Sequence, residues 1–206
     1  MLIGLDFDNT IAGYDALFSS AAVLEGLLAP GEAATKLDVR QRLRQRADGE
    51  ADWMRLQGRV YGAYMGDAVL IDGVADFFAA CRSAGADVRI VSHKTEFGHF
   101  DPDRVNLRDA AMDWMAANGF FDPAGFDLTP DHVSFAATRE AKVRRIAEIG
   151  CTHFVDDLVE VFTEPDFPQA TRRYLYHPGA GPAPAGPFTA FSDWRALSDE
   201  IFSRHG

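Results

Sequence analysis

The chain has 206 residues, which is enough for one domain of ordinary size or for a core with a modest insert. Its formal net charge of −11 argues against binding along the negatively charged backbone of a nucleic acid. Its apolar runs fall well short of a membrane span, and its N-terminus carries no signal segment, so we expect no membrane partner either.

The first predicted strand covers residues 2–7 and leads directly into Asp-Phe-Asp-Asn-Thr, residues 6–10. A buried strand with this ending places Asp6 and Asp8 at the carboxyl edge of a sheet. In α/β folds that edge is where ligands bind. The pair of aspartates therefore marks the first candidate site.

Residues 13–70 alternate between Ala/Leu-rich and charged stretches with few β-branched residues, which is typical of helices joined by loops. The part from Lys36 to Arg59 carries seven basic residues against four acidic ones. Such a segment is either a solvated helix face or, inside an acidic protein, a means of attracting an anionic substrate. The sequence leaves both interpretations open.

From residue 74 the pattern changes to that of alternating helices and strands. A predicted helix that ends at Gly85 precedes a strand at 87–91, which is rich in β-branched residues and ends at Ser92. This succession of helix, glycine and strand is half a βαβ unit and predicts a parallel sheet. We interpret residues 93–103 as a loop over the site. The further predicted elements are a helix from 107 to about 118, a strand at 132–135, a helix at 140–149, strands at 152–155 and 173–176, a loop at 178–187 and a helix at 193–203.

A second pair of aspartates, Asp156 and Asp157, follows the strand at 152–155. Four carboxylates at two strand ends repel one another unless a hard cation such as Mg²⁺ lies between them. This predicts a metal-assisted site. The two cysteines, Cys81 and Cys151, stand in apolar surroundings without zinc-site spacing, which favours a reducing, cytoplasmic compartment.

Four features stand in one order along the chain: Asp6-x-Asp8, Ser92 after a strand, Lys142 on a helix, and Asp156-Asp157 after another strand. This arrangement resembles the haloacid dehalogenase (HAD) superfamily of phosphotransferases, whose four motifs run in the same order. The resemblance covers residues 1–12 and 73–177. The region 13–72 matches the place where members of that family insert a helical cap.

The resemblance implies a role for each matching residue. Asp6 would be the nucleophile, Asp8 the general acid and then the base, Ser92 a donor to the phosphoryl oxygens, and Lys142 the partner of Asp6 and the phosphate. Mg²⁺ would be held by Asp6, Asp156 and the backbone carbonyl of Asp8, with Asp157 or Glu160 completing the shell. Residues expected near the substrate are Asn9, Thr10, His93 and Lys94.

We therefore expect an α/β fold with a Rossmann-like parallel sheet flanked by helices. Residues 1–12 and 73–206 would form the catalytic core, and residues 13–72 a small α-helical cap.

The second aspartate favours a Mg²⁺-dependent phosphatase acting on a small phosphorylated metabolite, because dehalogenases of the family replace it. Alternatives are a phosphomutase or phosphotransferase on the same scaffold and a non-catalytic ligand- or partner-binding member. A phospho-accepting receiver domain fits less well, since its accepting Asp ends a later strand. The sequence gives neither the substrate nor the oligomeric state.

Overall fold

The computed structural model describes residues 1–179 and 181–203. The chain divides into two compact units, which we call the sheet unit and the helical unit. The sheet unit contains Met1–Ile11, Leu70–Lys94 and the chain from Gly119 onward, and the helical unit contains Ala12–Val69 and Thr95–Asn118.

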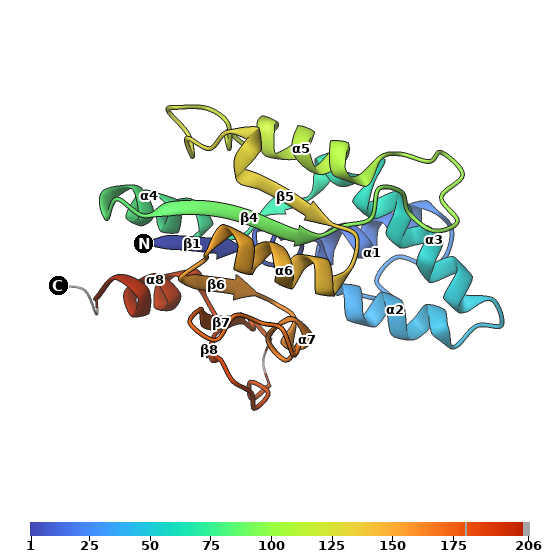
Figure 1. The fold of residues 1–206 in the computed structure, drawn as a ribbon. Helices are drawn as coiled ribbons and strands as arrows, with labels where there is room; N and C mark the ends of the chain where they lie inside the picture. Colours follow the sequence, from blue (N-terminus) through green and yellow to red (C-terminus); the bar gives the residue numbers. More distant parts are fainter. Residues whose placement is uncertain (180, 204–206) are drawn as a thin grey trace. The chain divides into compact units, whose positions relative to one another are not determined.

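The sheet unit is built on one six-stranded sheet with the order β5-β4-β1-β6-β7-β8, in which every neighbouring pair is parallel (Figure 1). The first strand therefore lies inside the sheet, between the strands that end at the other predicted motifs. The strands are β1 (Leu2–Leu5), β4 (Asp87–His93), β5 (Val133–Ala136), β6 (His153–Asp156), β7 (Arg172–Tyr176) and β8 (Thr189–Phe191).

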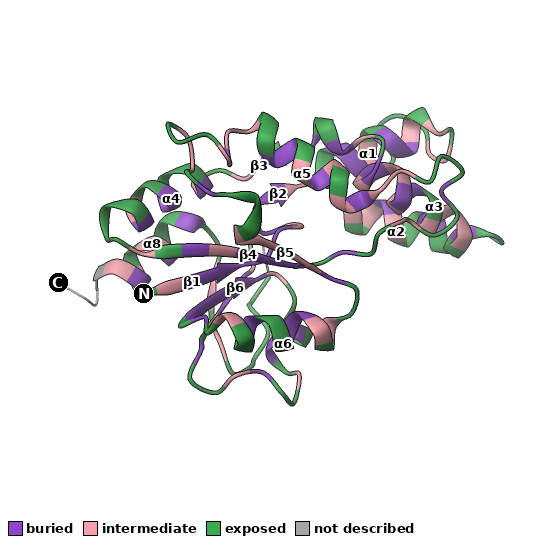
Figure 2. Cartoon of the chain, turned by 45° about the horizontal axis from the view of Figure 1, so that its top comes forward, coloured by how far each residue is buried: buried purple, intermediate pink, exposed green. Residues whose placement is uncertain are grey.

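Helices cover both faces of this sheet. In Figure 2, α6 (Arg139–Ile149) lies on one side of it, and α4 (Val74–Ser83) and α8 (Trp194–Ser203) lie together on the other. The α6 side encloses a buried cluster that also includes Val161 and Phe162 of α7 (Val159–Phe162). The predicted α/β, Rossmann-like architecture with a parallel sheet is thus confirmed.

Residues 130–132 form a 3₁₀ turn, η2 (Pro130–His132), before β5. The helix at 139–149 ends as the sequence predicts, at Gly150, whose φ of +75° is one that glycine adopts readily. Strand β8 was not predicted. It has three residues and follows a Pro- and Gly-rich segment, so it is too short to show a period of two.

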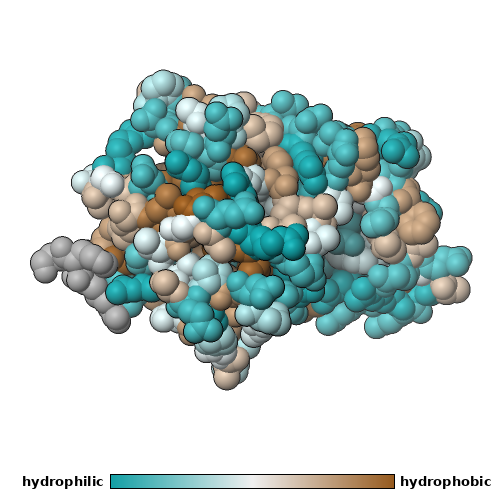
Figure 3. Space-filling view, in the orientation of Figure 1, coloured by the Kyte–Doolittle hydropathy of each residue, from teal (hydrophilic) through white to brown (hydrophobic). Residues whose placement is uncertain are grey.

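The helical unit consists of α1 (Asp15–Leu24), α2 (Lys36–Arg44), α3 (Gly49–Tyr61), the 3₁₀ turn η1 (Met65–Asp67) and α5 (Leu107–Ala117). Thr35 begins α2 with a capping box, in which its hydroxyl accepts the N–H of Asp38 and the Asp38 carboxylate accepts the N–H of Thr35. Figure 3 shows mostly hydrophilic residues over the visible face of α2, as expected of its charged sequence.

Residues 95–118 differ from the sequence prediction, which places them in the core. In the structure they belong to the helical unit, where the Trp114 indole N–H donates to the carbonyl of Ala68 at 2.9 Å. The loop before α5 also meets α3 closely, because a Cβ on Gly98 would lie 2.4 Å from the Cα of Gly58. The first segment of the unit, 12–69, lies close to the predicted insertion of 13–72. The role of this unit as a cap stays a prediction.

Two short strands, β2 (Ala12–Gly13) and β3 (Val69–Leu70), stand at the points in the sequence where one unit ends and the other begins. Among the described residues, no helix combines the length and the apolar character that crossing a membrane requires.

Candidate active site

Asp6 is the first residue after β1, and the parallel register fixes its neighbours. Leu5 pairs with Ile90 of β4 on one side and with Val155 of β6 on the other, and the Asp6 N–H donates to the Val155 carbonyl at 2.9 Å. The carboxyl ends of β4, β1 and β6 therefore lie side by side. Ser92 and Asp156 lie at the ends of β4 and β6, and Asp6 directly follows β1, as the sequence predicts.

Lys142 brings the positive charge to this edge from α6. Thr138 begins the helix by accepting the N–H of Ala141, and this start places Lys142 one turn into α6. Its Nζ donates to Asp6 Oδ1 at 2.5 Å and to Asp156 Oδ2 at 2.6 Å. All three side chains are buried, so each charge depends on the others for compensation.

The pKa values reflect this dependence. Burial alone would lower the pKa of Lys142, but the adjacent charges of Asp156 and Asp6 raise it above its ordinary range. Burial raises the pKa of Asp156, and the nearby Asp6 charge acts in the same direction, whereas the Lys142 ammonium opposes the shift. The two carboxylates thus repel each other and are held together by one lysine.

Asp157 joins the same edge. One carboxylate oxygen from each of Asp6, Asp156 and Asp157 can be chosen so that all three lie within 4.8 Å of one another. In the part of the chain that the structure describes, this is the group of metal-type ligands, and Glu160 is not among its members. Of the two alternatives that the sequence leaves open, the geometry therefore favours Asp157.

Two buried hydroxyls complete this part of the sheet unit. Ser92 lies near the end of β4 and Thr10 in the turn after Asp8, and both are buried. Within the described residues, neither the Ser92 Oγ nor the Thr10 Oγ1 has a hydrogen-bond partner. A buried hydroxyl without a partner is destabilising by about 1–3 kcal/mol, so such groups call for a ligand or a functional explanation.

Asp8 is not a member of the metal-type group. Its two carboxylate oxygens lie 3.0 and 2.8 Å from Nζ of Lys94, which is itself buried. The sequence predicts Lys94 near the substrate but does not predict this pairing. The expected metal contact of Asp8 was its backbone carbonyl, and that expectation stays a prediction.

Two further predicted residues stand nearby in the chain. Asn9 adopts a left-handed conformation with φ of 59°, which asparagine tolerates better than most residues and which turns the chain after Asp8. His93 is exposed, and its Nε2 lies 3.1 Å from the carbonyl oxygen of Ala137. Contact of either residue with a substrate remains a prediction.

Solved structures with the same fold provide the comparison. A HAD family hydrolase from Deinococcus radiodurans R1, with bound phosphate and sodium, matches with a TM-score of 0.60 at 16% identity over 98% of this chain and 95% of that one. The HAD-hydrolase YfnB from Bacillus subtilis, bound to magnesium, gives 0.58 at 13% over 97% of each chain. The L-2-haloacid dehalogenase RSc1362 gives 0.62 at 14% over 97% of each chain.

The chain has the haloacid dehalogenase fold. At these identities the likeness establishes the fold, and it agrees with the resemblance carried by the four motifs. No protein-family model matches the sequence, and no curated protein matches it either.

One contact near the site had no sequence signal. The Trp194 indole N–H donates to the carbonyl oxygen of Thr10 at 3.2 Å, across 184 residues of chain. Trp194 is buried and packs edge-on against Phe77 of α4. The last helix, α8, therefore supports the turn after Asp8. From sequence alone, a tryptophan at the start of a C-terminal helix is assigned to the hydrophobic core and not to a functional site.

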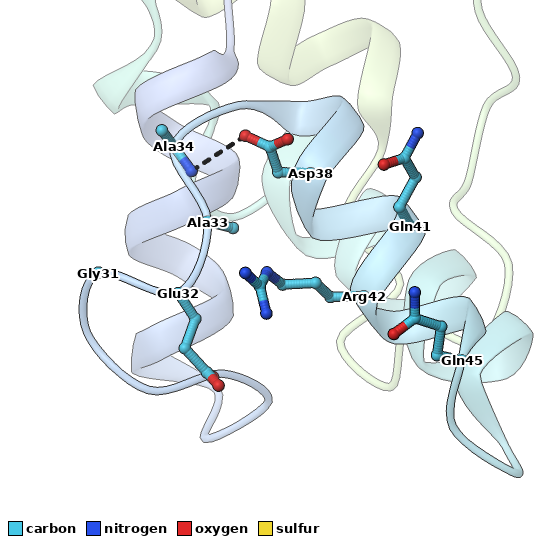
Figure 4. A pocket seen from close by; sticks show the side chains of 8 residues that line it. All are labelled: Gly31, Glu32, Ala33, Ala34, Asp38, Gln41, Arg42 and Gln45. Atoms are coloured by element: carbon cyan, nitrogen blue, oxygen red, sulfur yellow. Dashed lines mark hydrogen bonds between the residues drawn. The ribbon is translucent and has the colours of Figure 1, made fainter.

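A separate pocket of about 480 Å³ lies in the helical unit, between α2 and the loop before it (Figure 4). Arg42 reaches into it from α2, and the Ala34 N–H on the opposite wall donates to Asp38. Its lining side chains are solvent-exposed to a large extent and carry both signs of charge. It holds none of the residues that the four motifs predict.

Proposed function

We propose that this protein is a Mg²⁺-dependent phosphomonoester hydrolase that acts on a small phosphorylated metabolite through an aspartyl phosphate on Asp6. The observation that carries the proposal is the buried Lys142, which bridges Asp6 and Asp156, together with the unpartnered Ser92 hydroxyl near the end of β4. A nucleophilic carboxylate, a fixed cation and a free hydroxyl donor at one sheet edge are the groups that phosphoryl transfer requires.

The donor set fits Mg²⁺. Asp6, Asp156 and Asp157 offer three carboxylate oxygens within 4.8 Å of one another, and hard oxygen ligands are those that this ion prefers. When bound, Mg²⁺ would supply positive charge that offsets the phosphoryl oxygens and the carboxylates. A neighbour of the same fold carries magnesium and another carries phosphate, which supports the proposal.

In the first half-reaction Asp6 attacks phosphorus. Lys142 occupies its Oδ1, and no described protein group hydrogen-bonds to Oδ2, so this second oxygen is available to form the new bond. The bond between phosphorus and the leaving alcohol oxygen breaks at the same time. The carboxyl proton of Asp8 passes to that oxygen, and the Ser92 hydroxyl donates to a phosphoryl oxygen.

In the second half-reaction water attacks the phosphorus of the aspartyl phosphate. Asp8, now ionised, takes a proton from that water, and the bond between Asp6 and phosphorus breaks to give inorganic phosphate and the free carboxylate. Lys142 keeps the Asp6 carboxylate in place through both steps. Asp8→Asn is accordingly expected to slow both half-reactions.

The helical unit is proposed as the cap that selects the substrate and excludes water. Three arginines of its α2–α3 segment pair with acidic side chains (Arg44 with Glu50, Arg55 with Asp52 and Arg59 with Glu25), so part of the segment's positive charge is compensated within the unit. Cys81 and Cys151 are free and buried, which suits a cytoplasmic location.

The test is release of inorganic phosphate from a panel of sugar, nucleotide and amino-acid phosphates, measured with Mg²⁺ and with EDTA. Asp6→Asn is the loss-of-function variant, and Asp166→Asn, an exposed carboxylate, is its matched control. L-2-Chloropropionate belongs in the panel because one neighbour of the fold is a dehalogenase.

Mg²⁺-dependent release that Asp6→Asn abolishes and Asp166→Asn retains supports the proposal. Halide release without phosphate release contradicts it and assigns the dehalogenase reaction. Stable phosphorylation of Asp6 without turnover also contradicts it and favours a phospho-accepting or binding role.

A further inference from the structure

Lys94 reaches the site by a fixed path. It follows β4 directly, and its N–H donates to the carbonyl of Ala136 at 2.9 Å, so the sheet holds its backbone. Its Nζ lies 5.7 Å from the centre of the ring of Phe7, a buried residue that stands between Asp6 and Asp8 in the sequence. The side chain is 2% exposed, so the ammonium is withdrawn from water and needs a negative partner.

That partner is Asp8. Nζ lies 3.0 Å from Oδ1 and 2.8 Å from Oδ2, so the ammonium contacts both oxygens of one carboxylate. A contact to both oxygens restricts rotation of the carboxylate about its last bond more than a contact to one oxygen does. The Asp8 side chain is 19% exposed, so it is the member of the pair that can still meet a ligand or water.

The two lysines of the sheet unit therefore contact different carboxylates. Lys142 contacts Asp6 and Asp156, which belong to the metal-type group, whereas Lys94 contacts Asp8, which does not. This division assigns Lys94 to Asp8 and not to the carboxylates of the metal-type group. A Lys94 that left Asp8 to bind a phosphoryl group would have to give up a buried ion pair.

We propose that Lys94 is a positioning residue that holds the Asp8 carboxylate in place for the attack of water on the phosphorylated Asp6. The proposal rests on the proposed function for the identity of that step. Asp8 is negatively charged when it takes the proton from water, and an ammonium on both its oxygens suits this charged form. In the first step one oxygen of Asp8 carries a proton instead. Lys94 transfers no proton in either step, and Asp8 is the member of the pair that gives up and takes up the proton.

The kinetic experiment uses Lys94→Met and an aryl phosphate such as p-nitrophenyl phosphate. The p-nitrophenolate leaving group departs without help from an acid. With this substrate, only the rate of the water step therefore depends on Asp8. We expect kcat to fall by about tenfold to a hundredfold, the usual scale for a misplaced catalytic group, with KM changed by less than about threefold. Rapid mixing should show a burst of p-nitrophenol near one equivalent, because phosphorylated Asp6 accumulates.

A structural experiment does not depend on activity. Crystal structures of the wild type and of Lys94→Met should show the Asp8 carboxylate displaced or in several orientations in the variant. Lys94→Gln, which keeps an N–H donor without the charge, serves if Lys94→Met fails to fold. Arg195→Met, an exposed cation on α8, is the matched control and should change neither the kinetics nor the position of Asp8.

The outcomes separate the two proposals. An Asp8 carboxylate that keeps its wild-type position in both Lys94 variants overturns the positioning role. A large rise in KM with kcat unchanged and no burst also overturns it and makes Lys94 a phosphate-binding residue. A wild type that releases no phosphate from any ester overturns the proposed function, while a displaced Asp8 in the variants still establishes that Lys94 positions it.

Discussion

Nζ of Lys142 lies 2.6 Å from Oδ2 of Asp156, and both side chains are buried. The same Nζ contacts Asp6 at 2.5 Å, so one ammonium compensates two carboxylates at the edge of the sheet. Two buried negative charges and one positive charge leave a local excess of negative charge. The stability of this edge should therefore depend both on the lysine and on any cation bound beside it.

Lys142→Met is expected to lower the free energy of unfolding by about 3–5 kcal/mol in EDTA, because it leaves buried carboxylates without a cation. Urea unfolding followed by circular dichroism measures this loss. Added Mg²⁺ should restore part of the stability, since it supplies positive charge to the same carboxylates. Arg145→Met removes an exposed cation from the same helix, whose pairing with Glu148 is a surface contact, and should cost no more than about 1 kcal/mol. Equal unfolding midpoints for the two variants would show that Lys142 does not carry the charge balance.

Binding of Mg²⁺ should raise the melting temperature of the wild type, because an ion that binds only the folded state stabilises it by about 2.7 kcal/mol at a hundred times its dissociation constant. Asp157→Asn should reduce this rise, since Asp157 belongs to the metal-type group. Glu160→Gln is the matched control, because Glu160 is exposed and outside that group. Thermal melts with Mg²⁺ and with EDTA give the comparison. A rise that Glu160→Gln loses and Asp157→Asn keeps would reverse the assignment.

Much of the sheet edge could be predicted because the end of a strand has a local sequence signal, an apolar run followed by polar residues. The apolar runs before Asp6, Ser92 and Asp156 mark β1, β4 and β6, and parallel pairing brings such ends together. Lys142 was predicted through the resemblance to the four motifs, which its place on the helix before Gly150 matches. These features need no knowledge of side-chain packing.

Other features depend on contacts that no local pattern encodes. The pairing of Lys94 with Asp8 joins residues 86 positions apart and follows from the course of one side chain near the Phe7 ring. The assignment of residues 95–118 to the helical unit follows from their packing there, as in the bond from Trp114 to Ala68. A sequence pattern shows that α5 is amphipathic, but it does not show which apolar surface the helix covers.

His132 gives a prediction on pH. Burial lowers its pKa below the usual value of 6.5, with a further contribution from Arg89, and its Nδ1 is buried without a hydrogen-bond partner among the described residues. The unfolded chain therefore binds a proton more readily than the folded chain between the lowered pKa and 6.5. Stability should fall as the pH drops through this window.

His132→Gln is expected to reduce that fall, because the substituted side chain takes up no proton in either state. Urea midpoints measured from pH 7.5 to pH 5 in small steps show the slope for the wild type and the variant. His99→Gln, which removes an exposed histidine, should leave the slope unchanged. An identical slope in the wild type and His132→Gln would mean that other groups cause the loss of stability.

The contact between Gly98 and Gly58 makes the last prediction. A Cβ on Gly98 would lie 2.4 Å from the Cα of Gly58, which is backbone of α3 and can move away only if the helix or the loop shifts. Gly98→Ala should therefore destabilise the helical unit by about 1–3 kcal/mol, the usual effect of overpacking. Gly66→Ala is the matched control, because its Cβ would meet no atom within 4 Å. Urea unfolding gives the free energies, and limited proteolysis at residues 95–105 shows whether the loop has separated from α3. If Gly98→Ala is as stable and as protease-resistant as Gly66→Ala, the loop packs against α3 less closely than the structure has it.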